Sequence, residues 1–431
     1  MFFQQSLFYT NIVTISWKLI TKKGLALQST ARSILLTVKF GRKEEAELNK
    51  IFTFLGKPRT INHQIANRKV SWLELFYDLI FAVVIARLTD SLLENLTITS
   101  IGYSVLIFGW FIWGWNEVSG YFDNHGNDSI INVLIINTEM ILTGIGSLFI
   151  SEAIDGEFTR ISIVLMLIEL LMATVWFGLA YFDHIHGPAS RVWGSVHLFS
   201  LAIMLITYFI GNVVLVIGLC FGLLLNIFDV VAANPRLARE YDQAEMEHKI
   251  KDSMIERYGL MTMIALGEII AGLYETVNSR ITSDTIIRFI ICIILIALIA
   301  AIYYQVLGTL HIILSSSIAT ILTGWLFILA IMFSFYMGVT IQMVLRYEGT
   351  VRQMMGNLAF VLSLILFLAV IRAIVFIGTE TEKQENKKLI TGYLIIEDII
   401  LVGIAFAPTI WFLSGAVIVL LIIIMQGRLL N

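Results

Sequence analysis

The chain has few charged residues and almost no cysteine, and both shortages narrow what it can be. Asp, Glu, Lys and Arg make up 14% of its 431 residues, whereas an average soluble domain has about 25%. Cys220 and Cys292 lie in separate apolar runs, which supports neither a disulfide framework nor a thiolate metal site. Motifs for ATP hydrolysis, ester hydrolysis or dinucleotide binding do not occur in a suitable setting, so no enzyme activity, catalytic residue or cofactor is predicted. A net charge of −3 argues against a nucleic-acid partner.

Hydrophobic residues dominate instead. They make up 58% of the chain, and its mean hydropathy is +0.85. The apolar runs are continuous and close to the roughly 20 residues that a helix needs to cross a bilayer, whereas membrane β-barrels have segments of about ten residues that alternate in polarity. We therefore predict an all-α, polytopic transmembrane helix bundle. Twelve spans are predicted, and ten or eleven fit as well: 72–93, 99–119, 130–151, 160–181, 192–210, 212–233, 254–276, 284–305, 311–334, 353–377, 390–407 and 409–427.

Residues 1–70 differ from the rest because they are strongly basic. They hold 12 Lys or Arg and only three acids. Basic segments beside membrane spans stay on the cytoplasmic side, so we predict a cytoplasmic N-terminal arm on a multi-pass protein of the cell membrane. The arm either lies on the inner leaflet or is a solvated tail. The first transmembrane half then covers residues 71–233, a cytoplasmic linker loop covers 234–252, and the second half covers 253–431.

The two halves show a sign of being six-helix repeats. Glu74 precedes Tyr121 by 47 residues, and Glu256 precedes Tyr303 by the same 47. An offset of 182 residues therefore aligns both pairs. In transporters built from such parallel repeats, the binding site lies near the midplane between the halves. Two short matches are also compatible with chance, so a bundle without repeats stays open.

Ionisable side chains inside the apolar runs are the main indication of function. Glu74 and Asp78 are four residues apart and share one helix face. A charge at the bilayer centre costs roughly 2.5–3.5 kcal/mol on insertion scales, so acids without partners must be hydrated, neutral or bound to a cation. Arg87 and Arg372 are the bases predicted at this depth. The acids predicted there outnumber them: Glu74, Asp78, Glu139, Glu169 and Glu268.

Tryptophans and glycines in the spans have ordinary structural explanations. Trp110, Trp113 and Trp115 are more typical of an interfacial aromatic belt than of a binding cage. Gly218 and Gly222 are four residues apart, a spacing that predicts close packing of their helix against a neighbour.

Histidines gather in one part of the chain without forming a recognisable metal motif. His184, His186 and His197 follow or surround Asp183, but their spacing matches no zinc-binding pattern. We therefore predict no metal site.

Three motifs resemble those of one bacterial family. Residues 73–81, Leu-Glu-Leu-Phe-Tyr-Asp-Leu-Ile-Phe, are similar to the LELFFDLVF signature of the bacterial low temperature requirement A (LtrA) family. Residues 255–260 and 265–268 resemble its ERxGL and LGE motifs, and residues 113–123 resemble the end of its second span. The resemblance covers about residues 70–425 and implies a polytopic membrane protein. The family is named for a growth phenotype in the cold, which implies no particular biochemical activity.

A channel or secondary transporter for an ion or small polar solute is the function we expect. Phe76, Asp78 and Phe81 also resemble a signature in the first helix of non-canonical potassium channels built from six-span units. The alternative is a non-transporting membrane scaffold or sensor linked to cold or envelope stress. Membrane lipids and the small ion or solute are the expected partners, and a homo-oligomer stays open. The residues predicted to line or brace the path are Glu74, Asp78, Arg87, Glu139, Glu169, Glu256, Arg257 and Glu268.

Overall fold

The protein is a bundle of long helices, which confirms the predicted fold class. The structure, a computed structural model, describes residues 55–429 apart from residues 64, 66–67, 244, 246–247, 278–280, 308–313, 348 and 378–396. Most of the predicted basic arm therefore lies outside the described residues, as does much of the predicted span 390–407. The long helices of the described part are α3 Trp72–Glu94, α4 Ile98–His125, α5 Ile130–Ser147, α7 Thr159–Phe182, α8 Gly187–Ile210, α9 Asn212–Gln243, α10 Asp252–Val277, α11 Ser283–Leu307, α12 Ser317–Arg346, α13 Val351–Ile377 and α15 Thr409–Leu429. The short elements are η1 Ile61–His63 and α6 Ile150–Ile154, and residues 397–404 are also helical.

Eight of these helices are long and apolar enough to cross a membrane: α4, α5, α7, α8, α9, α11, α12 and α13. Helices α3 and α10 have 23 and 26 residues and pack among them, but both carry several charged side chains. Helix α15 has a shorter apolar part, Thr409–Met425. The chain is therefore a multi-pass membrane protein in which the charged helices α3 and α10 lie within the bundle.

Polar contacts at helix ends shift several predicted boundaries. Helix α4 continues to His125, whose Nδ1 donates to the backbone oxygen of Arg59 over 2.7 Å. Helix α9 continues through Pro235 to Gln243, and Glu240 near its end accepts a 2.6 Å hydrogen bond from His186 Nδ1. The predicted linker loop 234–252 is therefore wrong over residues 234–243, because they extend α9. The connection between α9 and α10 is the shorter segment 244–251.

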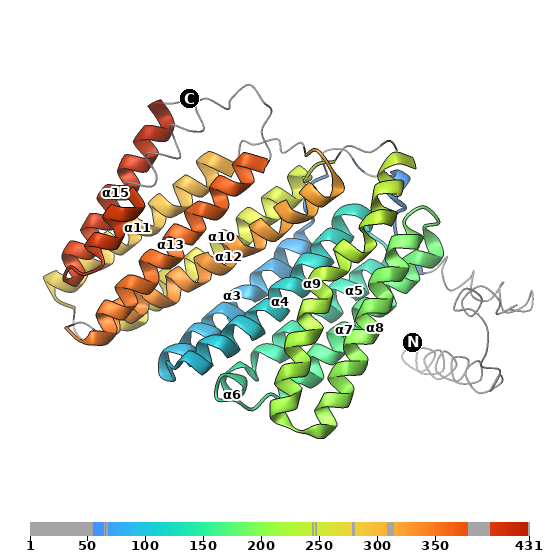
Figure 1. Ribbon diagram of the computed structural model, residues 1–431, viewed down its shortest axis with the longest axis horizontal. Helices are drawn as coiled ribbons and strands as arrows, with labels where there is room; N and C mark the ends of the chain where they lie inside the picture. Colours follow the sequence, from blue (N-terminus) through green and yellow to red (C-terminus); the bar gives the residue numbers. More distant parts are fainter. Residues whose placement is uncertain are drawn as a thin grey trace, which may run out of the picture. The chain divides into compact units, whose positions relative to one another are not determined.

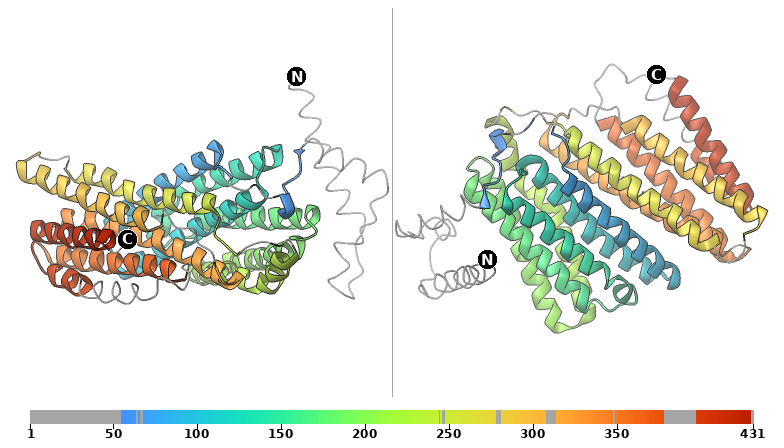
Figure 2. Two further views of the ribbon diagram at one scale, coloured as in Figure 1. Left: turned by 90° about the horizontal axis from the view of Figure 1, so that it is seen from above. Right: turned by 180° about the vertical axis from the view of Figure 1, so that it is seen from behind.

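Helices from the two parts of the chain form two groups (Figure 1). Helices α7, α8 and α9 pack side by side in one group, and α12 packs along α13 and α10 in the other. The groups meet where α10 and α12 contact α3, and α12 also contacts α4 and α9 (Figure 2). The junction between the halves is therefore built around the polar helices α3 and α10.

The contacts within the two groups agree with six-helix repeats. The first helix of each half packs on its third, as α3 on α5 and α10 on α12. The second helix packs on the sixth, as α4 on α9 and α11 on α15. The duplication suggested by the offset of 182 residues stays a prediction.

Helix α9 packs closely on α8 at Gly218 and Gly222, as predicted. A Cβ atom added at Gly222 would lie 2.7 Å from Ser200 Oγ, and one at Gly218 would lie 2.8 and 2.9 Å from Cγ2 and Cβ of Thr207. Both approaches are too close for a side chain, so the two glycines allow Thr207 and Ser200 of α8 to pack directly on the backbone of α9.

Replacing Gly218 by Ala is expected to destabilise the protein by about 1–3 kcal/mol, the usual cost of overpacking a tight contact. The free energy or midpoint of unfolding in detergent measures this. Gly178→Ala on α7 is the control, because nothing lies within 4 Å of the added Cβ there. Equal stability of the two variants would contradict the close packing.

Candidate functional site

Arg257 joins the two halves through a buried ion-pair cluster. Its guanidinium is 1% exposed, and its Nη2 donates to Asp78 Oδ1 over 2.5 Å while its Nε donates to Asp78 Oδ2 over 3.3 Å. Its Nη1 lies 3.4 Å from Glu74 Oε2. Glu74 and Asp78 share one face of α3, as predicted, and Arg257 lies on α10. We call Glu74, Asp78, Trp115 and Arg257 the Arg257 cluster.

Trp115 completes this cluster and corrects one prediction. Its Nε1 donates to Asp78 Oδ1 over 2.6 Å, and the Arg257 guanidinium lies 5.5 Å from the centre of its ring. Trp115 is fully buried, and Trp110 and Trp113 are each only 4% exposed. The prediction that these tryptophans form an interfacial belt is therefore wrong, because they pack inside the bundle.

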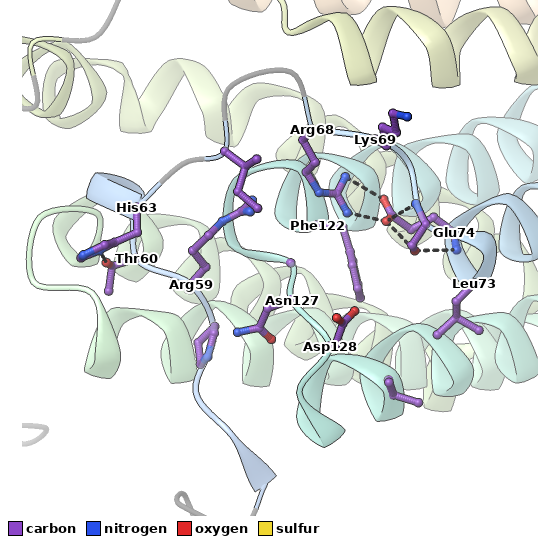
Figure 3. A pocket seen from close by; sticks show the side chains of 15 residues that line it. Arg59, Thr60, His63, Arg68, Lys69, Leu73, Glu74, Phe122, Asn127 and Asp128 are labelled. Carbon is purple, nitrogen blue, oxygen red and sulfur yellow. Dashed lines mark hydrogen bonds and ion pairs between the residues drawn. The ribbon is translucent and has the colours of Figure 1, made fainter.

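Glu74 connects the Arg257 cluster to a cavity at the start of α3 (Figure 3). The cavity has a volume of about 820 Å³, and Arg59, Arg68 and Lys69 are among its lining residues. Arg68 points toward Glu74 and is bonded to both of its carboxylate oxygens (Figure 3). Ser71 Oγ donates to Glu74 Oε1 over 2.7 Å. The two residues also form a capping box at the helix start, in which Glu74 N donates to Ser71 Oγ and Ser71 N donates to Glu74 Oε1. Glu74 therefore has polar contacts with Arg68, Ser71 and Arg257.

A second buried cluster surrounds His197 on α8. Its Nδ1 lies 2.7 Å from Glu169 Oε2, and its Nε2 lies 2.8 Å from Glu117 Oε1. Because carboxylates accept, both ring nitrogens donate, and an imidazole that donates twice is positively charged. Glu169 also accepts from Asn226 Nδ2, and Glu117 accepts from Trp176 Nε1 over 3.3 Å. His197 is thus the cation of a network that joins α4, α7, α8 and α9.

Two more acids in this cluster have carboxylate oxygens that lack a hydrogen-bond partner among the described residues. Asp229 on α9 is 2% exposed, and neither of its oxygens accepts an ordinary hydrogen bond from the described residues, although the amide of Val230 lies close. Glu139 on α5 is 1% exposed, and its Oε2 is likewise unpaired within the described part of the chain. Glu139 Oε1 faces Gly114, since a Cβ there would lie 3.3 Å from it. The His197 cluster consists of Glu117, Glu139, Glu169, His197, Asn226 and Asp229.

Charge in the His197 cluster is unbalanced. Four carboxylates, from Glu117, Glu139, Glu169 and Asp229, interact with one cation, His197. Isolated buried charges cost several kcal/mol each unless they are neutralised or paired. Glu139, Glu169 and His197 lie near the middle of their helices, where a membrane-spanning helix is farthest from water, whereas Asp229 lies near the end of the apolar part of α9. This cluster can therefore take up positive charge, either as protons or as a metal or alkali cation.

One short segment of α4 contacts both clusters. Trp115 donates to Asp78, and Asn116 Oδ1 accepts from Tyr258 Oη on α10 over 2.7 Å. The next residue, Glu117, belongs to the His197 cluster. Four consecutive residues, 114–117, therefore connect the junction between the halves to the partly unpaired acids.

The predicted path residues fall into three groups. Glu74, Asp78 and Arg257 form the first cluster, and Glu139 and Glu169 belong to the second. Glu268 is half-buried on α10 and belongs to the third group. Arg87 and Glu256 are exposed, so no contact ties them to a cluster among the described residues. Their role in a path stays a prediction.

The other charged groups singled out in the sequence have local partners. Arg372 Nη1 lies 3.1 Å from Asp398 Oδ2. Asp183 accepts from the backbone amides of Ile61 and His186 over 2.6 and 3.1 Å. His186 is paired with Glu240, so the neighbouring histidines and His197 do not form one common site.

Glu117 and Asp229 are functional candidates that sequence reasoning missed. Asp229 interrupts an apolar run just as Glu139 and Glu169 do, so the same signal could have found it. Glu117 follows a tryptophan-rich segment near the end of a span, where a charge is unremarkable. His197 was considered only with nearby histidines, whereas its partners come from helices far along the sequence. One imidazole nitrogen and the carboxylates of Glu117 and Asp229 lie within 4.8 Å of one another and could hold a metal ion.

The fold and these clusters define a multi-pass α-helical membrane protein with a charged interior. The model of one family, described as bacterial low temperature requirement A protein (LtrA), matches residues 69–426. The chain therefore belongs to the LtrA family, as its motifs indicate. No curated protein and no solved structure was found to match it.

Proposed function

We propose that the protein transports a cation across the membrane, as a channel or secondary transporter, and that the His197 cluster holds the cation on its way. One observation carries this proposal: the buried carboxylates of Glu139, Glu169 and Asp229 and the partly buried one of Glu117 interact with a single cationic histidine near the middle of its helix. Ionisable residues at such depth are costly, and in membrane proteins they mark ion pathways or proton relays. Asp229 and the Oε2 atom of Glu139 accept no ordinary hydrogen bond from the described residues, so both can take a cation as a partner.

The Arg257 cluster has a different part in this proposal. Asp78 is paired with Arg257, and Glu74 is paired with Arg257 and Arg68. Fully paired charges brace the contact between the halves and do not attract a further cation.

A non-transporting scaffold or sensor is the alternative, and the Arg257 cluster favours it. A buried arginine shared by two acids from another helix is sufficient to explain helix association without any transport. In this case the His197 cluster would be a static network, and neutralising its acids would change stability alone.

Glu139→Gln is expected to reduce cation flux into liposomes at least tenfold, because it removes a carboxylate and leaves the side-chain shape unchanged. The purified protein is reconstituted, and uptake of alkali cations and protons is measured beside empty liposomes. Glu157→Gln, an exposed acid in the loop before α7, is the control and should keep wild-type flux. Wild-type flux in Glu139→Gln, or no cation flux in the wild type, would favour the scaffold.

A further inference from the structure

We infer that Glu117, His197 and Asp229 form a binding site for a divalent transition-metal ion, with Glu169 orienting the histidine. This inference names the class of cation for the His197 cluster and so rests on the proposed function. The three donor groups come from α4, α8 and α9, and their ligand atoms lie within 4.8 Å of one another. A metal with bonds of about 2.0–2.2 Å spans ligand atoms up to about 4.4 Å apart. Small side-chain rotations would therefore close the site.

The surroundings of His197 match those of a metal-bound histidine. Such histidines usually donate one ring N–H to a carboxylate, which fixes the ring and raises its basicity, while the other nitrogen binds the metal. Glu169 Oε2 lies 2.7 Å from His197 Nδ1 and fills the first role. Asn226 donates in turn to the other oxygen of Glu169 and holds this carboxylate in place. His197 Nε2, which faces Glu117 over 2.8 Å, is then the ligand nitrogen.

Asp229 supplies the independent evidence that the site takes a ligand. It is 2% exposed, and both its oxygens lack an ordinary hydrogen bond within the described residues. A buried polar group normally has a partner, because leaving it unpaired costs about 1–3 kcal/mol and more when it is charged. Its position among the ligand atoms of Glu117 and His197 makes a cation the partner that fits.

Metal binding displaces one proton from His197. The metal forms a bond to His197 Nε2, and the proton that this nitrogen donates to Glu117 is released to solvent. The carboxylates of Glu117 and Asp229 bind the metal as anions. The Nδ1 proton stays between His197 and Glu169. The cluster thus loses one positive charge with the proton and gains two with the divalent ion, which reduces its excess of negative charge.

The ligand types select the class of metal. Imidazole suits zinc, iron, nickel and copper, whereas magnesium and calcium prefer oxygen ligands alone. One nitrogen with two carboxylates therefore favours zinc or another first-row divalent ion over magnesium and calcium. Thiolate is absent from the donor set, since Cys220 and Cys292 are not part of it.

The test uses the full chain purified in detergent and stripped of metal with a chelator. Zn²⁺, Mn²⁺, Mg²⁺ and Ca²⁺ are titrated separately, and bound metal and released protons are measured. We expect one tightly bound Zn²⁺ per chain with about one proton released, weaker binding of Mn²⁺, and no tight binding of Mg²⁺ or Ca²⁺. Asp229→Asn should weaken metal binding at least tenfold, and Glu169→Gln about 10–100-fold as a loss of the orienting carboxylate. Asp229→Asn keeps the side-chain shape and removes no hydrogen bond, so it should fold.

The outcomes separate this inference from the proposed function. Unchanged metal binding in Asp229→Asn, or no tight binding of either transition metal to the wild type, would overturn the metal site. If cation flux in liposomes then still depends on Glu139, the proposed transport stands and the cation is a proton or an alkali ion. Glu157→Gln is again the control and should bind metal like the wild type.

Discussion

Replacing Arg257 by Gln is expected to destabilise the protein by about 3–5 kcal/mol, the usual cost of removing one partner from a buried ion pair. Arg257 is 1% exposed, and its loss leaves Asp78 without its charged partner and Glu74 with Arg68 alone. Arg257→Lys should lose less stability than Arg257→Gln, because it keeps the positive charge. It should still be less stable than the wild type, because lysine cannot donate from two nitrogens to Asp78. Unfolding in detergent by heat or denaturant measures the difference.

A double variant tests whether the loss comes from the uncompensated acid. Adding Asp78→Asn to Arg257→Gln should recover a large part of the stability, because the buried negative charge is then gone. Arg160→Gln is the control, since Arg160 is 65% exposed and pairs with Glu152 at the surface, where such pairs contribute little. A small loss in Arg257→Gln, close to that of the control, would show that Arg257 does not hold the halves together.

His197→Leu is expected to cost a comparable 3–5 kcal/mol, because His197 is the cation of a cluster that holds four carboxylates. Its removal leaves Glu117 and Glu169 facing each other and Asp229 across the space of the ring. The protein should unfold at a lower temperature in detergent, and lowering the pH should recover stability, since protonation neutralises the acids that remain.

His184→Leu is the matched control, because His184 is exposed and three residues before the start of α8. Glu169→Gln added to His197→Leu should recover part of the loss by removing one of the unpaired charges. Full stability of His197→Leu would mean that the acids are neutral without it, and the description of His197 as the cation of this cluster would fail.

Sequence reasoning could predict the fold class because lipid imposes a simple rule. Every backbone polar group within the bilayer must be paired internally, so continuous apolar runs form helices. The helix ends were harder, since they depend on individual polar contacts such as that of Glu240 with His186. A span limit drawn at residue 233 follows the apolar run, whereas α9 continues for another ten residues beyond the apolar part.

The acidic residues of the site could be predicted from the sequence, but the residues that pair with them could not. Glu74 and Asp78 could be placed on one face from their spacing alone. Their partner Arg257 lies 179 residues beyond Asp78, and no local pattern shows which two helices meet. Arg87 on the same helix as Asp78 is closer in sequence, but it is exposed and has no such contact among the described residues.

The carboxylate of Glu74 makes three separate sets of contacts, so few substitutions at this position preserve all of them. It closes the first turn of α3, binds Arg68 at the wall of the cavity and contacts Arg257 across the junction. A shorter acid would lose reach, and a neutral amide would lose charge toward both arginines. We expect this position to tolerate almost no substitution in a library of variants selected for folding, whereas Arg87 on the same helix should accept many.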